Sequence, residues 1–365
     1  LMLLAYPIAK IGEIQNSTFA IMFLAPSIFL TAILSAYRGY FQGKNEMTGI
    51  AISQVLEQFL NIFISLLFAF LLYKISIQLG AAGGTIGTSI GAVIAIFYLI
   101  YVYDKKKFED IAYNTTNHEK KVSSKAILRK LLRYALPITL SAGIQNFGGM
   151  IDMMNVSRRL IHAGFTQTQS DSLYGLLYNY KVLIGVPLII VTALTTIVLP
   201  AVSRAYALRD RKAIRKNANF AFRIAFAITI PAAVGLAVLN NDVYTLLYQS
   251  DRGAYIMQYG SFILIFTAIA QLQSVILQGI SQFYPMILSF SVGIILKIIA
   301  NYILVGIPSI NILGVLVGNF LCYLAPVIIN HKILTKSIRY KIPLIRNCVK
   351  PIIASIVMAV VIIVL

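Results

Sequence analysis

The chain has 365 residues, of which 59% are hydrophobic and 12% are charged, and its formal net charge is +19. Soluble domains are about 45–50% apolar and about 25% charged, so this composition excludes a soluble enzyme and a nucleic-acid-binding domain. The two cysteines, Cys322 and Cys348, and the three histidines, His118, His162 and His331, show neither disulfide nor metal-ligand spacing, so we expect no metal and no cofactor.

Membrane-spanning helices account for most of the chain. A span needs about 20 mostly apolar residues. Ten stretches meet this length, in chain order 18–37, 48–73, 79–103, 134–157, 174–200, 217–240, 257–279, 284–305, 310–330 and 349–365. Residues 1–8 look like the end of a further helix. A strand of a membrane β-barrel alternates apolar and polar residues over about 10 positions, whereas these stretches are longer and continuously apolar. The sequence therefore predicts an all-α, polytopic membrane protein.

The basic residues predict how these spans are oriented. If the loop 104–133 is cytoplasmic, 24 of the 31 Lys and Arg residues fall on the cytoplasmic side and five on the outer side, while Lys181 and Lys297 fall within spans. Positive charge collects on the cytoplasmic side of membrane proteins. The excess charge therefore needs no nucleic-acid partner. We expect contacts with anionic membrane lipids and a monomeric protein.

Two parts of the chain are similar to each other, at offsets of 236 and 231 residues. The matched positions are Gln42-Gly43 with Gln278-Gly279, Ser53 with Ser289, Asn61 with Lys297, and Gly83 and Gly87 with Gly314 and Gly318. Both copies run in the same direction, which indicates a parallel repeat about an axis along the membrane normal. Because two helices precede the second copy, we expect the chain to lack two N-terminal helices and most of a third. The alternative is a short protein with unequal halves.

The predicted organisation follows from this repeat. We expect a partial N-terminal lobe at 1–110, a cytoplasmic linker at 111–130, a six-helix C-terminal lobe at 131–333 and an additional terminal helix at 343–365.

Polar residues inside the predicted spans are candidates for a functional site, because polar side chains are unfavourable in lipid. The candidates are Gln54, Glu57, Gln58 and Asn61 in one span, Gln145 and Asp152 in a second, Lys181 in a third, Gln271 and Gln278 in a fourth, and Lys297 and Asn301 in a fifth. They either line a hydrated cavity or form bonds between helices. A lysine in a cavity suits a pyrophosphate, and a buried carboxyl suits proton coupling. Pairing of Asp152 with Lys181 is the structural alternative.

Residues at the ends of two spans are further candidates. Arg38 and Gln42 lie at the predicted cytoplasmic mouth, where they could meet a headgroup or, for Arg38, simply anchor the helix. Arg158 and Arg159 lie at an outer end, where they could meet a lipid phosphate or a departing pyrophosphate, or lie at the interface as solvated residues. The loop 104–133 contains no glycine-rich phosphate loop, so we expect no transport driven by ATP.

Several segments carry a resemblance to a known family. They are RGYFQGKNEM (38–47), ISQVLEQ (52–58), IDMMNVSRRLIHAGF (151–165), LYG (173–175), LPAVSRAYALRD (199–210), PAAVGLAVL (231–239) and LQG (277–279). The chain resembles the stage V sporulation protein B type of polysaccharide transporter, in the multidrug/oligosaccharidyl-lipid/polysaccharide exporter superfamily, which also holds the lipid II flippases.

This resemblance implies fourteen helices, in two six-helix lobes around a central cavity with two terminal helices. It implies a flippase in the bacterial plasma membrane, not an enzyme. Its substrate would be an undecaprenyl-pyrophosphate-linked saccharide, moved to the outer leaflet by alternating access. The coupling ion, a proton or sodium, stays open.

Two other functions stay open. A drug or cation antiporter of the same superfamily would be expected to carry acidic and aromatic residues in its cavity. A membrane glycosyltransferase or polymerase using the same lipid carrier would need paired carboxylates or a metal motif in a loop, and the loop acids show no DxD arrangement.

Overall fold

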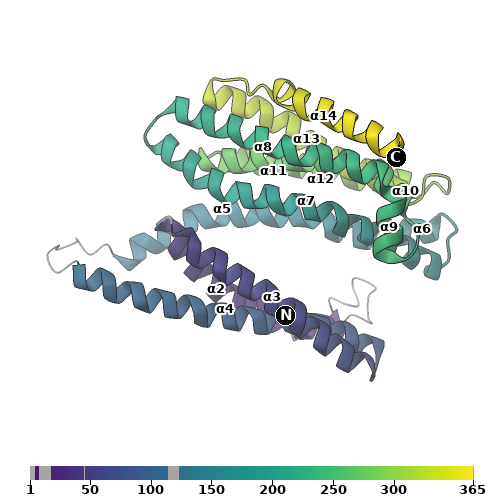
Figure 1. Ribbon diagram of the computed structural model, residues 1–365, viewed down its shortest axis with the longest axis horizontal. Helices are drawn as coiled ribbons and strands as arrows, with labels where there is room; N and C mark the ends of the chain where they lie inside the picture. Colours follow the sequence, from purple (N-terminus) through teal and green to yellow (C-terminus); the bar gives the residue numbers. More distant parts are fainter. Residues whose placement is uncertain (1–4, 8–17, 45, 114–122, 365) are drawn as a thin grey trace. The chain divides into compact units, whose positions relative to one another are not determined.

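The computed structural model describes residues 5–7, 18–44, 46–113 and 123–364, and within them it contains helices and no strand. The chain divides into two compact units, Leu1–Lys121 and Val122–Leu365. The first unit contains α2 (Thr18–Gly43), α3 (Met47–Tyr73) and α4 (Ile77–Tyr113). The second contains α5 (Ser124–Ile151), the π-helix η2 (Asp152–Val156), α6 (Ser157–His162), α7 (Gln167–Ala207), α8 (Arg211–Val238), α9 (Asn240–Tyr248), α10 (Ala254–Gly260), α11 (Ile263–Gly279), α12 (Phe283–Leu304), α13 (Leu313–Ile338) and α14 (Leu344–Val364) (Figure 1).

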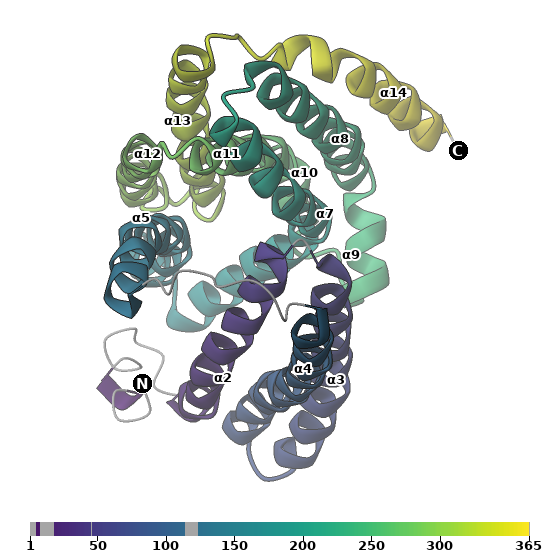
Figure 2. The same cartoon turned by 90° about the vertical axis from the view of Figure 1, so that its left-hand side faces the viewer.

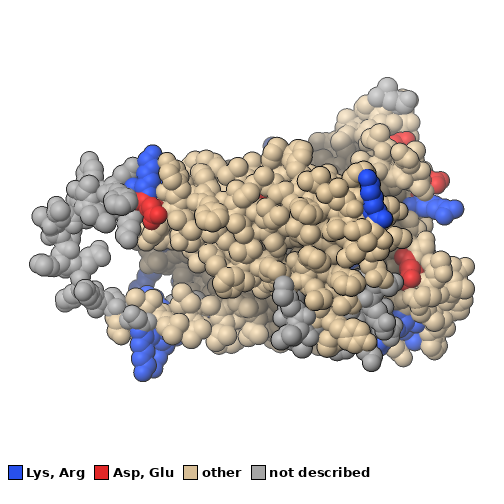
Figure 3. Space-filling view, turned by 90° about the horizontal axis from the view of Figure 1, so that it is seen from below, with Lys and Arg blue, Asp and Glu red and all other residues tan. Residues whose placement is uncertain are grey.

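The prediction of an all-α membrane protein is confirmed. Among the described residues, eight helices are long and apolar enough to cross a membrane, and the bent pair α10–α11 makes a ninth. These nine coincide with nine of the ten predicted spans. The tenth, 134–157, is helical through α5 and η2 but is less apolar, because small and polar residues such as Gly143, Asn146 and Gly149 interrupt it. Figure 3 shows charged side chains gathered towards the ends of the helices, with a broad belt of other residues between them.

In the first unit, α4 packs along both α2 and α3. Its core joins Leu34 and Phe41 of α2 to Ala92 and Leu99 of α4. Hydrophobic burial contributes little to helix association in lipid, so close approach of backbones at small residues must supply much of the packing.

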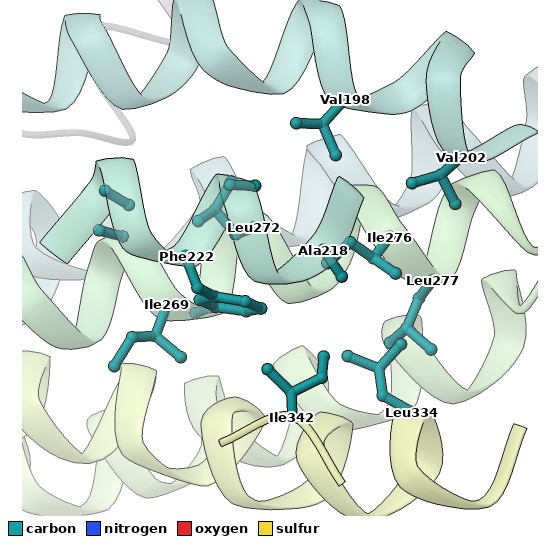
Figure 4. Close-up of a cluster of buried hydrophobic side chains, with 14 of the residues drawn as sticks. Val198, Val202, Ala218, Phe222, Ile269, Leu272, Ile276, Leu277, Leu334 and Ile342 are labelled. Atoms are coloured by element: carbon teal, nitrogen blue, oxygen red, sulfur yellow. The ribbon is translucent and has the colours of Figure 1, made fainter. Parts of the chain in front are cut away.

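The second unit has a core to which α7, α8, α11, α12 and α13 contribute. Val198 and Val202 of α7, Phe222 of α8, Leu272 of α11 and Leu334 of α13 meet there (Figure 4). The last helix, α14, runs beside α8 (Figure 2). These core residues pack α7, α8, α11 and α13 together. The helix α12 is also attached by its contact with α13.

The internal repeat is visible at glycines where two neighbouring helices pack closely. In the first unit, a Cβ on Gly87 of α4 would lie 2.5 Å from the Asn61 carbonyl oxygen of α3, and would overlap the Ser65 hydroxyl. In the second unit, a Cβ on Gly318 of α13 would overlap the Asn301 side-chain oxygen of α12. The offset that aligns Asn61 with Lys297 also aligns Ser65 with Asn301. Each unit therefore packs an equivalent glycine against the equivalent turn of the preceding helix.

The turns that precede these helix pairs also match. The Glu46 amide donates to the Phe41 carbonyl at 2.9 Å, and the Gln282 amide donates to the Leu277 carbonyl at 2.8 Å. Each of these residues is the N-cap of the following helix, α3 or α12. The equivalence predicted from short sequence matches therefore extends to the backbone.

Candidate functional site

A π-turn interrupts the helix that carries Asp152. α5 runs into η2 and α6 with helical backbone angles at each junction, so residues 124–162 form one continuous helix with a π-turn inside it. π-turns occur mostly as single turns within α-helices and are frequent at functional sites. Asp152 is the first residue of this π-turn and is completely buried.

Asp152 accepts hydrogen bonds from three side chains of two other helices. Its Oδ2 atom lies 2.6 Å from Lys181 Nζ of α7 and 3.0 Å from Lys297 Nζ of α12. Its Oδ1 atom accepts from Asn301 Nδ2 of α12 at 3.0 Å. We refer to Asp152, Lys181, Lys297 and Asn301 as the Asp152 cluster. Three helices, distant in sequence, are thus joined at one carboxylate.

Lys297 is the buried cation of the cluster. Its side chain is 5% exposed, and its ammonium also donates to the Gly148 carbonyl at 2.9 Å. Gly148 lies one turn before Asp152. A Cβ at this position would lie 3.4 Å from the lysine ammonium, which is ordinary van der Waals contact. A buried charge is tolerated only when it is paired and hydrogen-bonded, and Lys297 meets both conditions.

Lys181 differs from Lys297 in exposure. Its side chain is 30% exposed, although its ammonium is bonded to the same carboxylate oxygen. With both lysines charged, the cluster carries two positive charges against one negative charge, a net charge of +1. If Lys181 turned to an external anion, Lys297 would still neutralise Asp152. The arrangement therefore offers one cation to an anionic ligand without leaving a buried charge unpaired.

A second ion pair lies in the first unit. Arg38 of α2 donates from Nη2 to Glu57 Oε2 of α3 at 2.7 Å, and from Nε to the Ser53 hydroxyl at 3.1 Å. The Arg38 and Glu57 side chains are 21% and 15% exposed. The sequence analysis placed Arg38 at the cytoplasmic mouth and left Glu57 open between a cavity and a bond between helices, and it did not foresee that the two residues bind each other.

The other candidates on α3 lie on or near its surface. Gln54 and Gln58 are exposed, and Asn61 is half-buried, where its Oδ1 accepts from the Ser65 hydroxyl at 2.9 Å. Gln42 of α2 is half-buried.

The candidates on α11 bond within the second unit. Gln271 donates to the Thr192 hydroxyl of α7 at 2.9 Å, and Gln278 lies 3.6 Å from the Met286 sulfur. These are contacts between helices, which were one of the two alternatives in the sequence analysis; the other was the lining of a cavity. The side chain of Gln145 lies outside the described residues. A cavity shared by the two lobes stays a prediction.

Arg159 is held by protein contacts at the end of α12. Its Nε donates to the Tyr302 carbonyl at 2.9 Å, and its guanidinium lies 4.1 Å from the centre of the Tyr302 ring. The guanidinium also fills the space that a side chain on Gly306 would need. Arg159 therefore joins α6 to α12, whereas its neighbour Arg158 is exposed.

Known proteins with similar sequences include lipid II flippases and sporulation proteins. The family model described as lipid II flippase MurJ matches residues 1–365. The lipid II flippase MurJ of Bacillus subtilis (strain 168) is 24% identical over 325 residues, which cover 86% of this chain and 59% of the relative. Stage V sporulation protein B of the same organism is 26% identical over 333 residues, which cover 90% of this chain and 64% of the relative.

Solved structures show the same fold. A lipid II flippase MurJ in an inward closed conformation has a TM-score of 0.65 at 18% identity, covering all of this chain and 74% of that chain. An outward-facing multidrug resistance MATE family transporter of the MOP superfamily has a TM-score of 0.69 at 17% identity, covering 90% and 70%. The chain spans 59% and 64% of the length of the two curated relatives. Because the family model matches along the entire chain, the protein belongs to the lipid II flippase MurJ family.

Proposed function

We propose that this multi-pass membrane protein is a flippase for polyprenyl-pyrophosphate-linked saccharides such as lipid II. It would move them from the cytoplasmic to the outer leaflet of the bacterial plasma membrane. The observation that carries the proposal is the match of the lipid II flippase MurJ family over residues 1–365. The name of one curated relative, the lipid II flippase MurJ, supports the same substrate class.

The Asp152 cluster supplies a binding role that fits this substrate. A pyrophosphate is a compact, multiply charged anion, and a lysine ammonium is a compact cationic donor. Lys181 is the partly exposed member of a cluster with a net positive charge. In the proposed mechanism Lys181 exchanges Asp152 for a phosphate oxygen, and Lys297 keeps Asp152 neutral during the exchange.

The proposed transport cycle requires no covalent step, so the protein acts as a transporter and not as an enzyme. The two lobes expose the headgroup path first to the cytoplasm and then to the outside, while the polyprenyl tail stays in the lipid. A proton or sodium gradient is the proposed energy source.

A cation antiporter is the less favoured function. The MATE transporters share the fold with this chain, but fold alone does not assign function. An external cation would approach two ammonium groups and one carboxylate in the Asp152 cluster and would be repelled by the net charge. An anionic headgroup would be attracted.

A leaflet assay tests the proposal. Fluorescent lipid II is placed in proteoliposomes containing the purified protein, and its exposure on each side is followed over time. The wild type is expected to move the lipid faster than protein-free vesicles. Loss of one charge-assisted hydrogen bond, about 1.5–3 kcal/mol, predicts that Lys181→Gln slows flipping about 10-fold to 150-fold.

The controls distinguish a failure of the proposed function from a failure of the role proposed for Lys181. Lys336→Gln, which changes an exposed lysine of α13 that lies outside the cluster, is expected to flip at the wild-type rate. Wild-type flipping no faster than that of empty vesicles would overturn the proposed function. An unaltered rate in Lys181→Gln, with an active wild type, would overturn only the role of Lys181.

A further inference from the structure

A cavity of about 680 Å³ lies in the second unit, at the end that the basic residues predict to be cytoplasmic. It is open on one side and is lined by the ends of α7, α11 and α13 and by the beginnings of α8 and α12. Its polar lining comes from Tyr206, Arg209, Arg211, Gln282 and Ser337. This volume lies within the range of about 300–1,000 Å³ that is usual for small-ligand sites.

The two arginines of this cavity have no acidic partner among the described side chains. Both are exposed, and no ion pair of the described residues includes either of them. Asp210 lies between them in sequence, but its carboxylate accepts from the Ala213 amide at 3.0 Å and caps α8. Residues 209–211 therefore carry two guanidinium groups and one carboxylate, which leaves a net charge of +1 at the cavity wall.

The start of α8 adds to this positive potential. The N-terminus of a helix carries a partial positive charge, so acidic residues are favoured there and basic residues are not. The first turn of α8 has no acidic residue, and Arg211, Lys212, Arg215 and Lys216 follow within its first six positions. The N-cap carboxylate of Asp210 offsets part of this positive charge, and an anion bound in the cavity would offset more of it.

The backbone conformation of Arg209 is a further feature of the cavity wall. Arg209 has φ of 54°, in the left-handed region, directly after the end of α7. Glycine is the usual residue at such a helix end, because a side chain there costs about 1–2 kcal/mol. The helices α9 and α13 end in the same conformation at Gln249 and Arg339, so this is a helix-end feature that places Arg209 at the cavity wall.

The cavity also has an apolar floor. Ile214, Ile280 and Ile338 line it and are all buried. A free phosphate would gain nothing from these side chains, whereas the first carbons of a lipid would pack on them. Guanidinium groups bind phosphate oxygens in a bidentate manner. The combination suits a phosphate that is attached to an apolar chain.

We propose that this cavity binds the phosphate group of an anionic lipid at the cytoplasmic face of the membrane. Arg209 and Arg211 bind the phosphate oxygens, Gln282 and Ser337 bond to the polar remainder of the headgroup, and the three isoleucines contact the start of the chain. The site is separate from the Asp152 cluster and does not depend on flipping. The same chemistry is offered by a glycerophospholipid and by a polyprenyl pyrophosphate.

Binding measured by native mass spectrometry on the detergent-purified protein tests the site. The probes are phosphatidylglycerol, undecaprenyl pyrophosphate, phosphatidylcholine and inorganic pyrophosphate. For the wild type we expect tight binding of one or both anionic lipids, and at least tenfold weaker binding of phosphatidylcholine and inorganic pyrophosphate. Tighter binding of phosphatidylglycerol identifies a membrane lipid as the occupant, and tighter binding of undecaprenyl pyrophosphate identifies a site for the carrier lipid.

Three variants make the test specific. Arg209→Gln/Arg211→Gln is expected to weaken anionic-lipid binding at least tenfold, and Arg209→Lys/Arg211→Lys to retain most of it. The matched control, Lys341→Gln/Lys350→Gln, removes two exposed basic residues outside the cavity and is expected to change binding less than twofold. Equal weakening by the control, unchanged binding in the double glutamine variant, or inorganic pyrophosphate bound as tightly as the lipids would overturn the proposal.

Discussion

The unequal burial of the two lysines in the Asp152 cluster leads to a graded prediction for stability. Lys297 is 5% exposed and bonds to Asp152 and to the Gly148 carbonyl, whereas Lys181 is 30% exposed. Three single variants are compared: Asp152→Asn, Lys297→Met and Lys181→Met. Each removes one charge while keeping approximately the size of the side chain.

The expected magnitudes follow from which charge is left without a partner. Asp152→Asn leaves the buried Lys297 ammonium without a counter-charge, and breaking a buried pair costs about 3–5 kcal/mol. Lys297→Met removes the deeper of the two cations but leaves Asp152 paired with Lys181 at 2.6 Å, so we expect the smaller cost of its lost hydrogen bonds, about 1–3 kcal/mol. Lys181→Met leaves Asp152 paired with Lys297, so the loss is that of a partly exposed ion pair, about 0–1 kcal/mol.

Thermal unfolding measures how much stability each of the three variants loses. A thiol-reactive dye reports exposure of Cys322, which is 6% exposed in α13, in a Cys348→Ser background. For a domain of about 150–250 residues, 1 kcal/mol shifts the midpoint by about 2–4 °C. We therefore expect Asp152→Asn to lower the midpoint by about 6–20 °C, Lys297→Met by about 2–12 °C and Lys181→Met by about 0–4 °C.

The double variant Asp152→Asn/Lys297→Met decides whether pairing is the cause. Removing both charges leaves no unpaired buried ion, so the double variant should lose much less stability than the sum of its single variants. Strict additivity would refute the reasoning. So would an effect of Lys181→Met as large as that of Lys297→Met.

Three further predictions concern contacts between helices. Gly318→Ala places a Cβ against the Asn301 oxygen and is expected to destabilise the protein by about 1–3 kcal/mol, while Gly143→Ala, which meets open space, is the control in the same unfolding assay. Charge reversal at Arg38 or Glu57 alone is expected to lower the unfolding midpoint, and the double reversal to recover part of it; no recovery would argue against their pairing. Arg159→Gln loses a hydrogen bond and a ring contact and is expected to cost about 2–4 kcal/mol, measured as a lower unfolding midpoint; an unchanged midpoint would contradict the contact with α12.

Most of the fold could be predicted from the sequence because hydropathy is a local property. A stretch of about 20 apolar residues has few alternatives to a membrane helix, whatever surrounds it. The prediction was weakest at 134–157, where glycine and polar residues reduce the apolar signal although the chain is still helical. The π-turn at Asp152 gave no signal that the sequence analysis used.

The candidate site was only partly predictable. Asp152, Lys181, Lys297 and Asn301 were all identified, because polar residues in a span stand out against an apolar background. The pairing of Asp152 with Lys181 was one of the two alternatives considered. The pairing of Asp152 with Lys297 was not foreseen, since the two residues are 145 positions apart.

The sequence by itself determined which segments are helices, which ends are basic and which residues are too polar to face lipid. Each of these depends only on the composition of a short segment. Only the tertiary structure decided which helices are neighbours and how each is rotated about its axis. The partners of Asp152 depend on both, because an ammonium reaches a carboxylate only when η2, α7 and α12 meet at that depth, and there the lack of a side chain at Gly318 leaves room for Asn301.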